Sequence, residues 1–342
     1  MPSPKTIGAF ITGCAGLSLS PEEVDFFRDR NPWGLILFKR NCETPEQLKA
    51  LTAAFRAAVG RRDAPVFIDQ EGGRVQRLGP PSNAWRKYPP ARSYGELYAR
   101  DPLAALRTAR HVGRLMAEDL MAVGITANCV PVLDVPQADG HEIIGNRAYG
   151  ESGECIMVLA RAHVAGFMDG GVLPVIKHIP GHGRATADSH HALPIVESPA
   201  DQLRSVDFPP FAAFADAPMA MTAHVIFTAL DRKNPATLSP KIIKKVIRQE
   251  IAFGGLLMTD DLSMKALSGS LAERTERALA AGCDIVLHCN GALPEMKQVA
   301  TAAGTLRGKA RKRARMALKS ARKPQTFDRK AALKDLEALV SG

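Results

Sequence analysis

The sequence predicts an α/β fold, a single-domain (β/α)8 TIM-type barrel with a basic helical extension at its C-terminus. Short apolar runs alternate with longer helical patterns, which is typical of βα units around a parallel sheet. Many of the runs end in a polar or charged residue, and no linker or internal repeat divides the chain. We assign residues 1–305 to the barrel and residues 306–342 to the extension.

The predicted strands are continuous apolar runs rather than alternating ones, as expected for strands covered on both faces. In chain order they are Ile7–Gly13, Gly34–Phe38, Pro65–Asp69, Ile125–Asp134, Leu173–His178, Ala220–His224, Gly255–Asp260 and Cys283–His288. An open, doubly wound sheet is the alternative, but it gives no reason for eight such repeats.

The predicted helices lie between these runs. They are Pro45–Val59, Pro102–Val123, Glu154–Gly170, Asp201–Ala215, Pro240–Ile251 and Leu271–Ala281. Two of them begin with a capping side chain followed by proline, at Thr44-Pro45 and Ser239-Pro240, which is a typical helix start.

The basic extension accounts for the charge imbalance of the chain. The 342 residues carry a formal net charge of +10, and residues 307–330 alone hold eleven Lys or Arg against one acid, Asp328. We expect a solvated terminal helix, with neither nucleic acid nor membrane as a partner. The functional alternative is a contact with anionic cell-wall fragments, nucleic acid or a membrane surface.

The cysteines and the N-terminus favour a cytoplasmic protein. None of the six cysteines forms a CxxC pair, and Cys129, Cys283 and Cys289 lie in apolar runs typical of buried positions. Residues 11–14 faintly resemble a lipoprotein cleavage box, but the preceding apolar stretch is short and fits a first strand better.

Polar residues at the strand ends predict one polar mouth, because barrel active sites lie at the C-terminal ends of the strands. An unpaired charge at the end of a buried strand would be costly without such a role. The residues concerned are Asp69, Asp134, Lys177-His178, His224, Asp260-Asp261 and His288.

A loop rich in glycine and histidine follows the fifth predicted strand, since Pro180, Gly181 and Gly183 prevent regular structure there. Asp188 and His190 lie two residues apart on this loop, so in an extended stretch their side chains would point the same way. Such a carboxylate would orient the imidazole, a recurring arrangement in acid/base catalysis.

The same segment raises the alternative of a zinc site. Its histidines, His178, His182, His190 and His191, could be metal ligands, but no HxxxH or HExxH spacing is present. We therefore expect no metal and no other cofactor. A third interpretation is a surface loop with solvated histidines.

Two adjacent acids, Asp260 and Asp261, end the seventh predicted strand. Neighbouring side chains in a strand face opposite ways, so only one points easily into the mouth. Asp261 is suited to cap the following helix, which leaves Asp260 for the ligand.

The segment from Asp69 to Arg77 combines acids and arginines around a Gly-Gly turn. Carboxylates accept hydrogen bonds from sugar hydroxyls and arginine donates a fork of them, so the segment could bind a polyhydroxylated ligand. By itself it could equally be an ion-paired turn. The glycine spacing matches no nucleotide-binding motif.

Together these segments closely resemble the β-N-acetylglucosaminidases of glycoside hydrolase family 3, the single-domain bacterial enzymes of peptidoglycan recycling. The motifs that carry the resemblance are IDQEGGRVQR, NCVPVLDV, IGNRAYGE, KHIPGHGRATADSHHALP, TAHV and MTDDLSM. They occur in the family's order and cover residues 34–290.

The resemblance implies a retaining exo-β-N-acetylglucosaminidase acting on a small GlcNAc-containing substrate. It implies Asp260 as the nucleophile and His190 as the general acid/base, with Asp188 as its partner. The resemblance also implies that the sugar is bound by Asp69, Arg77, Arg147, Lys177 and His178. A histidine acid/base departs from the two-carboxylate plan of most retaining glycosidases.

Two features depart from the family pattern: the stretch HHALP after the DSH motif, and the basic tail. Among related activities, the DSH motif argues against a β-glucosidase or β-xylosidase. A phosphorylase stays open as an alternative, since a histidine would not repel phosphate as a carboxylate does. We expect a monomer or a weak dimer.

Overall fold

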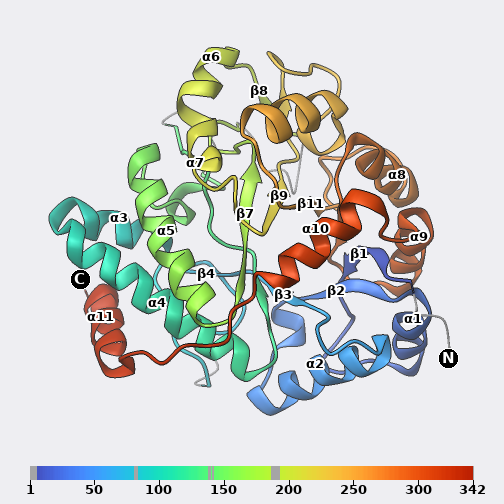
Figure 1. Cartoon of the computed structure of the whole chain (residues 1–342), viewed down its shortest axis with the longest axis horizontal. Helices are drawn as coiled ribbons and strands as arrows, with labels where there is room; N and C mark the ends of the chain where they lie inside the picture. The colour runs from blue at the N-terminus through green and yellow to red at the C-terminus, as the bar shows by residue number, and fades with distance from the viewer. Residues whose placement is uncertain (1–5, 81–83, 138–139, 141, 186–192, 342) are drawn as a thin grey trace.

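The computed structural model describes residues 6–80, 84–137, 140, 142–185 and 193–341. Its centre is a closed barrel of parallel strands in the order β1-β12-β11-β9-β7-β6-β3-β2 (Figure 1). The strands are β1 (Gly8–Thr12), β2 (Pro32–Leu37), β3 (Val66–Ile68), β6 (Ala127–Asn128), β7 (Leu173–Ile179), β9 (Met219–Thr222), β11 (Leu256–Asp261) and β12 (Ile285–His288). Each corresponds to one of the eight predicted runs, so the predicted barrel is confirmed.

Helical segments follow every barrel strand and form the outer layer. They are α1 (Pro21–Arg30), α2 (Pro45–Val59), α3 (Ala91–Arg100), α4 (Pro102–Ala122), α5 (Gly153–Asp169), α6 (Ala200–Gln202), η3 (Leu203–Asp207), α7 (Phe208–Ala212), η5 (Ile242–Glu250), α8 (Leu271–Ala281) and α9 (Leu293–Ala303). Short 3-10 turns lie at η1 (Lys39–Asn41), η2 (Gly145–Arg147) and η4 (Ala236–Leu238). The predicted helix over 201–215 is present as one helical stretch from Ala200 to Ala212, whose middle part, Leu203–Asp207, is a π-helix directly before Phe208-Pro209-Pro210.

Local sequence explains why the elements begin and end where they do. The Thr44 side chain accepts from the backbone N–H of Gln47, Pro45 occupies the first turn, and Gly60 ends α2 in the left-handed region. The strand that precedes α2 is buried along its whole length, with Leu35, Ile36 and Leu37 at most 1% exposed. Burial on both faces of the strands produces the continuous apolar runs seen in the sequence.

The N-terminal run and the three cysteines predicted to be buried lie in the core as expected. Ile11 and its neighbours form β1, and Cys129, Cys283 and Cys289 are all buried. No helix in the described ranges is both long enough and apolar enough to cross a membrane.

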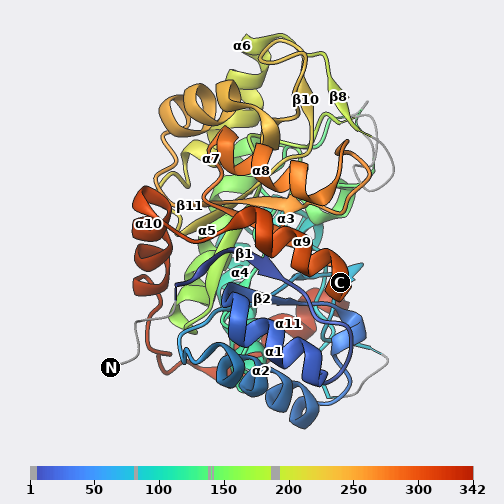
Figure 2. The ribbon, with the colours of Figure 1, turned by 90° about the vertical axis from the view of Figure 1, so that its right-hand side faces the viewer.

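The C-terminal region forms two further helices, α10 (Gly308–Lys319) and α11 (Arg329–Ser341). Arg313 of α10 pairs with Asp284, which directly precedes β12, at 2.9 Å. Helix α11 packs on α4, where Asp335 accepts from His111 and Arg107. Figure 2 shows α10 along the left edge of the molecule. The division of the chain at residue 305 stays a prediction.

Candidate active site

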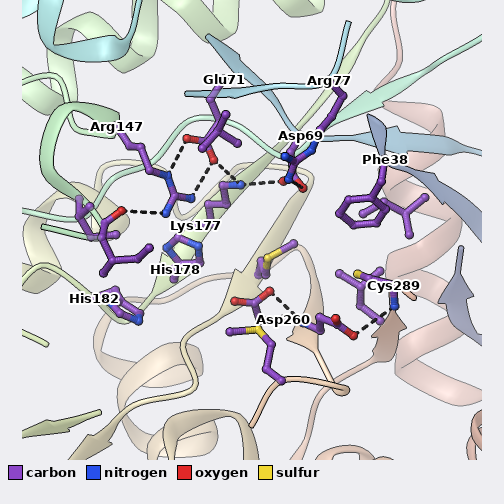
Figure 3. Close-up of a pocket in the computed structure, with 18 of the residues that line it drawn as sticks. Phe38, Asp69, Glu71, Arg77, Arg147, Lys177, His178, His182, Asp260 and Cys289 are labelled. Atoms are coloured by element: carbon purple, nitrogen blue, oxygen red, sulfur yellow. Dashed lines mark hydrogen bonds and ion pairs between the residues drawn. The ribbon is translucent and has the colours of Figure 1, made fainter. Parts of the chain in front are cut away.

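A polar cavity of about 330 Å³ lies at the C-terminal ends of the barrel strands (Figure 3). Of the predicted site residues, the structure brings together six in its lining: Asp69, Arg77, Arg147, Lys177, His178 and Asp260. The other two, Asp188 and His190, lie outside the described residues. Further lining comes from Phe38, Glu71, Arg74, His182, Met221, Asp261, Met264 and Cys289.

A tight hairpin places Arg77 beside Asp69. Strand β4 (Gln70–Gly72) pairs antiparallel with β5 (Val75–Gln76), so the chain reverses within a few residues. Gly72 is needed at this reversal because its φ is +100° and an added Cβ would lie 2.2 Å from the Pro89 carbonyl oxygen. The Arg77 Nη2 atom therefore returns to within 3.2 Å of Asp69 Oδ2.

An alternating network of charges runs along one wall of the cavity. Lys177 Nζ lies 2.9 Å from Asp69 Oδ1 and 2.7 Å from Glu71 Oε1. Arg147 donates to both oxygens of Glu71, from Nε and Nη2, each at 2.8 Å. This bidentate pair fixes the guanidinium plane. Each buried charge in the network therefore has an opposite partner.

The network keeps its members charged. Burial raises the pKa of Asp69, but Lys177 and Arg77 lower it by more, so it lies well below its ordinary value. Burial opposes the charge of Lys177 too, but the Asp69 and Glu71 carboxylates hold its pKa above the usual range. Ionised carboxylates that accept and cations that donate suit a ligand rich in hydroxyl groups.

His178 is held from behind by Asp134. The Nδ1 atom of His178 lies 2.7 Å from Asp134 Oδ2, and the backbone N–H groups of His178 and His182 both donate to Asp134 Oδ1. Asp134 is fully buried. With Nδ1 bonded to this carboxylate, Nε2 of His178 is the atom free for a ligand.

His182 lies next to this pair, its ring centroid 5.6 Å from that of His178. Burial, together with repulsion from His178, lowers its pKa to about 4, so the ring is neutral at neutral pH. Its Nδ1 atom is buried with no hydrogen-bond partner among the described residues. The ring is thus available as a neutral polar group in the cavity wall.

Asp260 is the last residue but one of β11 and lies below the charged network in Figure 3. Its Oδ1 accepts from the backbone N–H of Asp261 at 2.8 Å. Burial raises the pKa of Asp260, but His224, His178 and this hydrogen bond outweigh burial, and the pKa lies below its ordinary value. The carboxylate is therefore ionised at neutral pH and available as a nucleophile.

Asp261 does not cap the following helix, and that prediction was wrong. Its carboxylate accepts from the backbone N–H and hydroxyl of Ser263 and from the backbone N–H of Cys289. Helix α8 starts ten residues later, where Ser270 caps it. Asp261 thus shapes the turn after β11 and ties it to the end of β12, which fixes the residue before it.

The remaining strand-end histidines lie outside the cavity lining. His224 contacts the carbonyl oxygen of Asp261 at 3.0 Å and Thr237 Oγ1 at 2.7 Å, so it supports the Asp260 segment from behind. His288 instead faces α9 and pairs with Glu295 at 3.1 Å. The predicted convergence was wrong for His288, because successive side chains of a strand point to opposite sides and Leu287 and Cys289 take the inward positions.

In the described ranges, no group of three or more His, Cys, Asp or Glu side chains is arranged to hold a metal ion. Of the histidines weighed for zinc, His178 and His182 line the cavity, whereas His190 and His191 lie outside the described residues.

Sequence reasoning missed the roles of Glu71 and His182 in the cavity wall and of Asp134 behind it. Glu71 lies two residues after Asp69 and so shares its side of an extended chain, a signal that could have found it. Asp134 ends a predicted strand, but its partnership with His178 joins residues 44 positions apart. The parallel pairing of the β6 and β7 segments, with Val132 opposite Lys177, brings those two together.

Comparison with known proteins agrees with this geometry. Residues 16–318 match the family model described as glycosyl hydrolase family 3 N terminal domain. A beta-hexosaminidase of Methylobacillus flagellatus is 39% identical over 292 residues, covering 83% of this chain and 81% of the relative. One of Alkalilimnicola ehrlichii is 40% identical over 288 residues, with the same coverage.

Solved structures of NagZ from Neisseria gonorrhoeae share the fold. One, in complex with zinc ion, has a TM-score of 0.86 at 30% identity and covers 98% of both chains. Another, in complex with N-trifluoroacetyl-D-glucosamine, has a TM-score of 0.82 at 31% identity, covering 98% of this chain and 99% of the other. The family match spans most of the barrel and includes every described site residue, so the chain belongs to glycosyl hydrolase family 3 and is a glycoside hydrolase.

Proposed function

We propose that the protein is a retaining exo-β-N-acetylglucosaminidase that hydrolyses terminal, non-reducing β-linked GlcNAc. The observation that carries the proposal is the ionised Asp260 carboxylate in one cavity with the Asp69–Lys177–Glu71–Arg147 network. The relatives named beta-hexosaminidase and the neighbour bound to N-trifluoroacetyl-D-glucosamine support an N-acylated amino sugar as the ligand.

In this proposal the charged network binds the sugar ring. Asp69 accepts hydrogen bonds from paired sugar hydroxyls. Arg77, Lys177 and the free Nε2 of His178 donate to hydroxyl oxygens of the sugar. Arg147 donates to Glu71 from Nε and Nη2 and to the Ile143 carbonyl oxygen from Nη1, so it holds that carboxylate and has one N–H on each of Nη1 and Nη2 left for the sugar. Because these groups are already positioned by one another, little side-chain entropy is lost on binding.

Asp260 would attack the anomeric carbon and form a glycosyl-enzyme, with the glycosidic oxygen leaving as an alcohol. His190, oriented by Asp188, would donate the proton to that oxygen and later take one from the attacking water. The roles of this dyad rest on the DSH motif alone, because both residues lie outside the described part of the chain. Two inversions at the same carbon give net retention.

As substrate we propose GlcNAc-anhydro-muropeptides released during cell-wall recycling in the cytoplasm, with the enzyme acting as a monomer or weak dimer. The family resemblance supports this choice. Phosphorolysis is the competing reaction. In a phosphorylase, phosphate rather than water would attack the same glycosyl-enzyme. Product analysis with and without phosphate separates the two: free GlcNAc in both supports hydrolysis, and a sugar phosphate would refute it.

The nucleophile can be tested by covalent trapping. A 2-acetamido fluoro-sugar inactivator should label one peptide, at Asp260, and a label elsewhere would overturn the mechanism. Asp260→Gly should reduce kcat by about three orders of magnitude or more. Added azide should restore turnover of an activated aryl substrate and yield the inverted glycosyl azide, since the small anion fills the vacated position. Asp63→Ala, an exposed residue at the opposite end of the barrel, should keep full activity.

A further inference from the structure

The basic tail forms a continuous cationic face on α10. Lys309, Arg311, Lys312, Arg315 and Lys319 are all exposed, whereas Ala314 and Ala317 are buried against the barrel. At 3.6 residues per turn the five exposed cations fall within an arc of about 160° opposite Ala314 and Ala317, and Lys309 and Lys312 also line a groove between α10 and the barrel. Arg311, Arg315 and Lys319, four residues apart, form a row along the helix. We call these five residues the α10 basic face.

In the described part of the chain the five cations have no ion-pair partner, and the acid that lines the groove with Lys309 and Lys312, Asp216, is paired with Arg161. Arg313, on the buried side of the same helix, is instead paired with Asp284. The sequence has no Asp or Glu between Arg307 and Phe327. Structural ion pairing therefore accounts for the inward arginine but not for the outward cations.

An apolar side chain lies among the cations. Met316 is 55% exposed and falls inside the same arc as Lys312 and Arg315. Met316 also lines the edge of the groove between α10 and the barrel, beside Ala217 and Pro218. A helix whose exposed face combines Lys and Arg with an apolar residue is suited to the boundary between water and lipid.

The α10 basic face is turned away from the cavity. Arg313 joins α10 to Asp284, which precedes β12, so the helix covers the N-terminal ends of strands. The cavity lies at the C-terminal ends, around Asp69 and Asp260. In Figure 2 α10 runs along one edge of the molecule. A large partner on this face would leave the cavity open to soluble substrate.

We propose that the α10 basic face docks the protein reversibly on the anionic headgroups of a lipid bilayer. This goes beyond the proposed hydrolase activity and does not depend on it, and it revises the expectation that no membrane is involved. Clusters of four to eight basic residues on an amphipathic helix are typical of such binding. Nucleic acid is the less favoured occupant, because residues 308–326 contain no aromatic side chain on which bases could stack.

The test is co-sedimentation of the full chain with vesicles. The protein should pellet with vesicles of equal parts phosphatidylglycerol and phosphatidylcholine, but not with phosphatidylcholine alone. Raising the salt several-fold should release it, because screening shortens the reach of surface charges. R311E/R315E/K319E should lower the partition coefficient roughly tenfold or more. The wild type and the R311E/R315E/K319E variant should have the same thermal unfolding midpoint and the same glycosidase activity.

A matched control separates the α10 basic face from net charge. K241E/K244E/K245E reverses three exposed lysines around η5 and changes the net charge by the same amount. This control should bind vesicles nearly as well as the wild type. The proposal is overturned if the wild type fails to pellet, if both triple variants lose binding equally, or if a DNA duplex competes for the protein more tightly than the anionic vesicles at the same salt.

Discussion

His178 Nδ1 lies 2.7 Å from Asp134 Oδ2, and Asp134 is fully buried behind the cavity wall. The carboxylate fixes which ring nitrogen of His178 faces a ligand. It also accepts from the backbone N–H of His182, so one side chain positions the start of the loop that leaves β7.

Asp134→Asn should therefore impair catalysis without touching the substrate. The amide can present an N–H to Nδ1, which favours the wrong tautomer and turns the ring. We expect kcat/KM on an aryl β-GlcNAc substrate to fall by about 100-fold. Asp335→Asn is the matched control, because Asp335 holds His111 Nδ1 at 2.8 Å far from the cavity. Equal activity of both variants and wild type would show that the Asp134 contact has no positioning role.

Glu71→Gln should destabilise the protein as well as weaken substrate binding. Glu71 is 7% exposed and shared by Lys177 and Arg147, so the neutral amide leaves buried positive charge uncompensated. The loss should be about 3 kcal/mol in urea unfolding. Glu118→Gln, which disturbs the more exposed pairs with Arg86 and Arg329, should cost less than about 1 kcal/mol. Similar losses in the two variants would contradict the assignment of Glu71 to a buried network.

Asp207 should make stability depend on pH between about 4 and 6. Burial raises its pKa from the ordinary 3.8 to about 6, although the ion pair with Arg184 acts in the opposite direction. In this window the folded state holds a proton that the unfolded state releases, so Asp207 stabilises folding at the acidic end and this contribution is lost as the pH rises through about 6. The difference in unfolding free energy, wild type minus Asp207→Asn, should accordingly fall as the pH is raised. If the difference in unfolding free energy stays constant from pH 4 to 7, the raised pKa of Asp207 is refuted.

Metal removal should leave activity unchanged, because the proposed chemistry needs only a carboxylate nucleophile and an imidazole acid/base. Exhaustive dialysis against a chelator, followed by assay with and without added zinc, is the measurement. A loss of activity that zinc restores would instead favour the metal-site interpretation of His178, His182, His190 and His191.

Much of the site could be predicted because the active-site residues of such barrels lie at the C-terminal ends of the strands. Asp69, Lys177, His178 and Asp260 each end or follow an apolar run, and the order of the runs places all of them at the same rim. Arg77 and Arg147 were predicted as sugar-binding residues from the family motifs. Glu71 was not singled out, and Asp134 was predicted as a strand-end acid without its partner His178, because the sequence does not show which distant cation or histidine an acid will contact.

The sequence by itself determined the eight-strand barrel, the position of α2 and α8, and the group of side chains that meet at one rim, since periodicity and capping are local properties of the chain. Tertiary structure alone decided that His288 turns away toward Glu295 while Leu287 and Cys289 face inward, and that Asp261 secures a turn rather than a helix. It also decided that Arg313 is paired while five neighbouring cations face outward. The physical reason is that side-chain orientation and charge pairing depend on how neighbouring strands and helices pack on one another, which periodicity and capping do not specify.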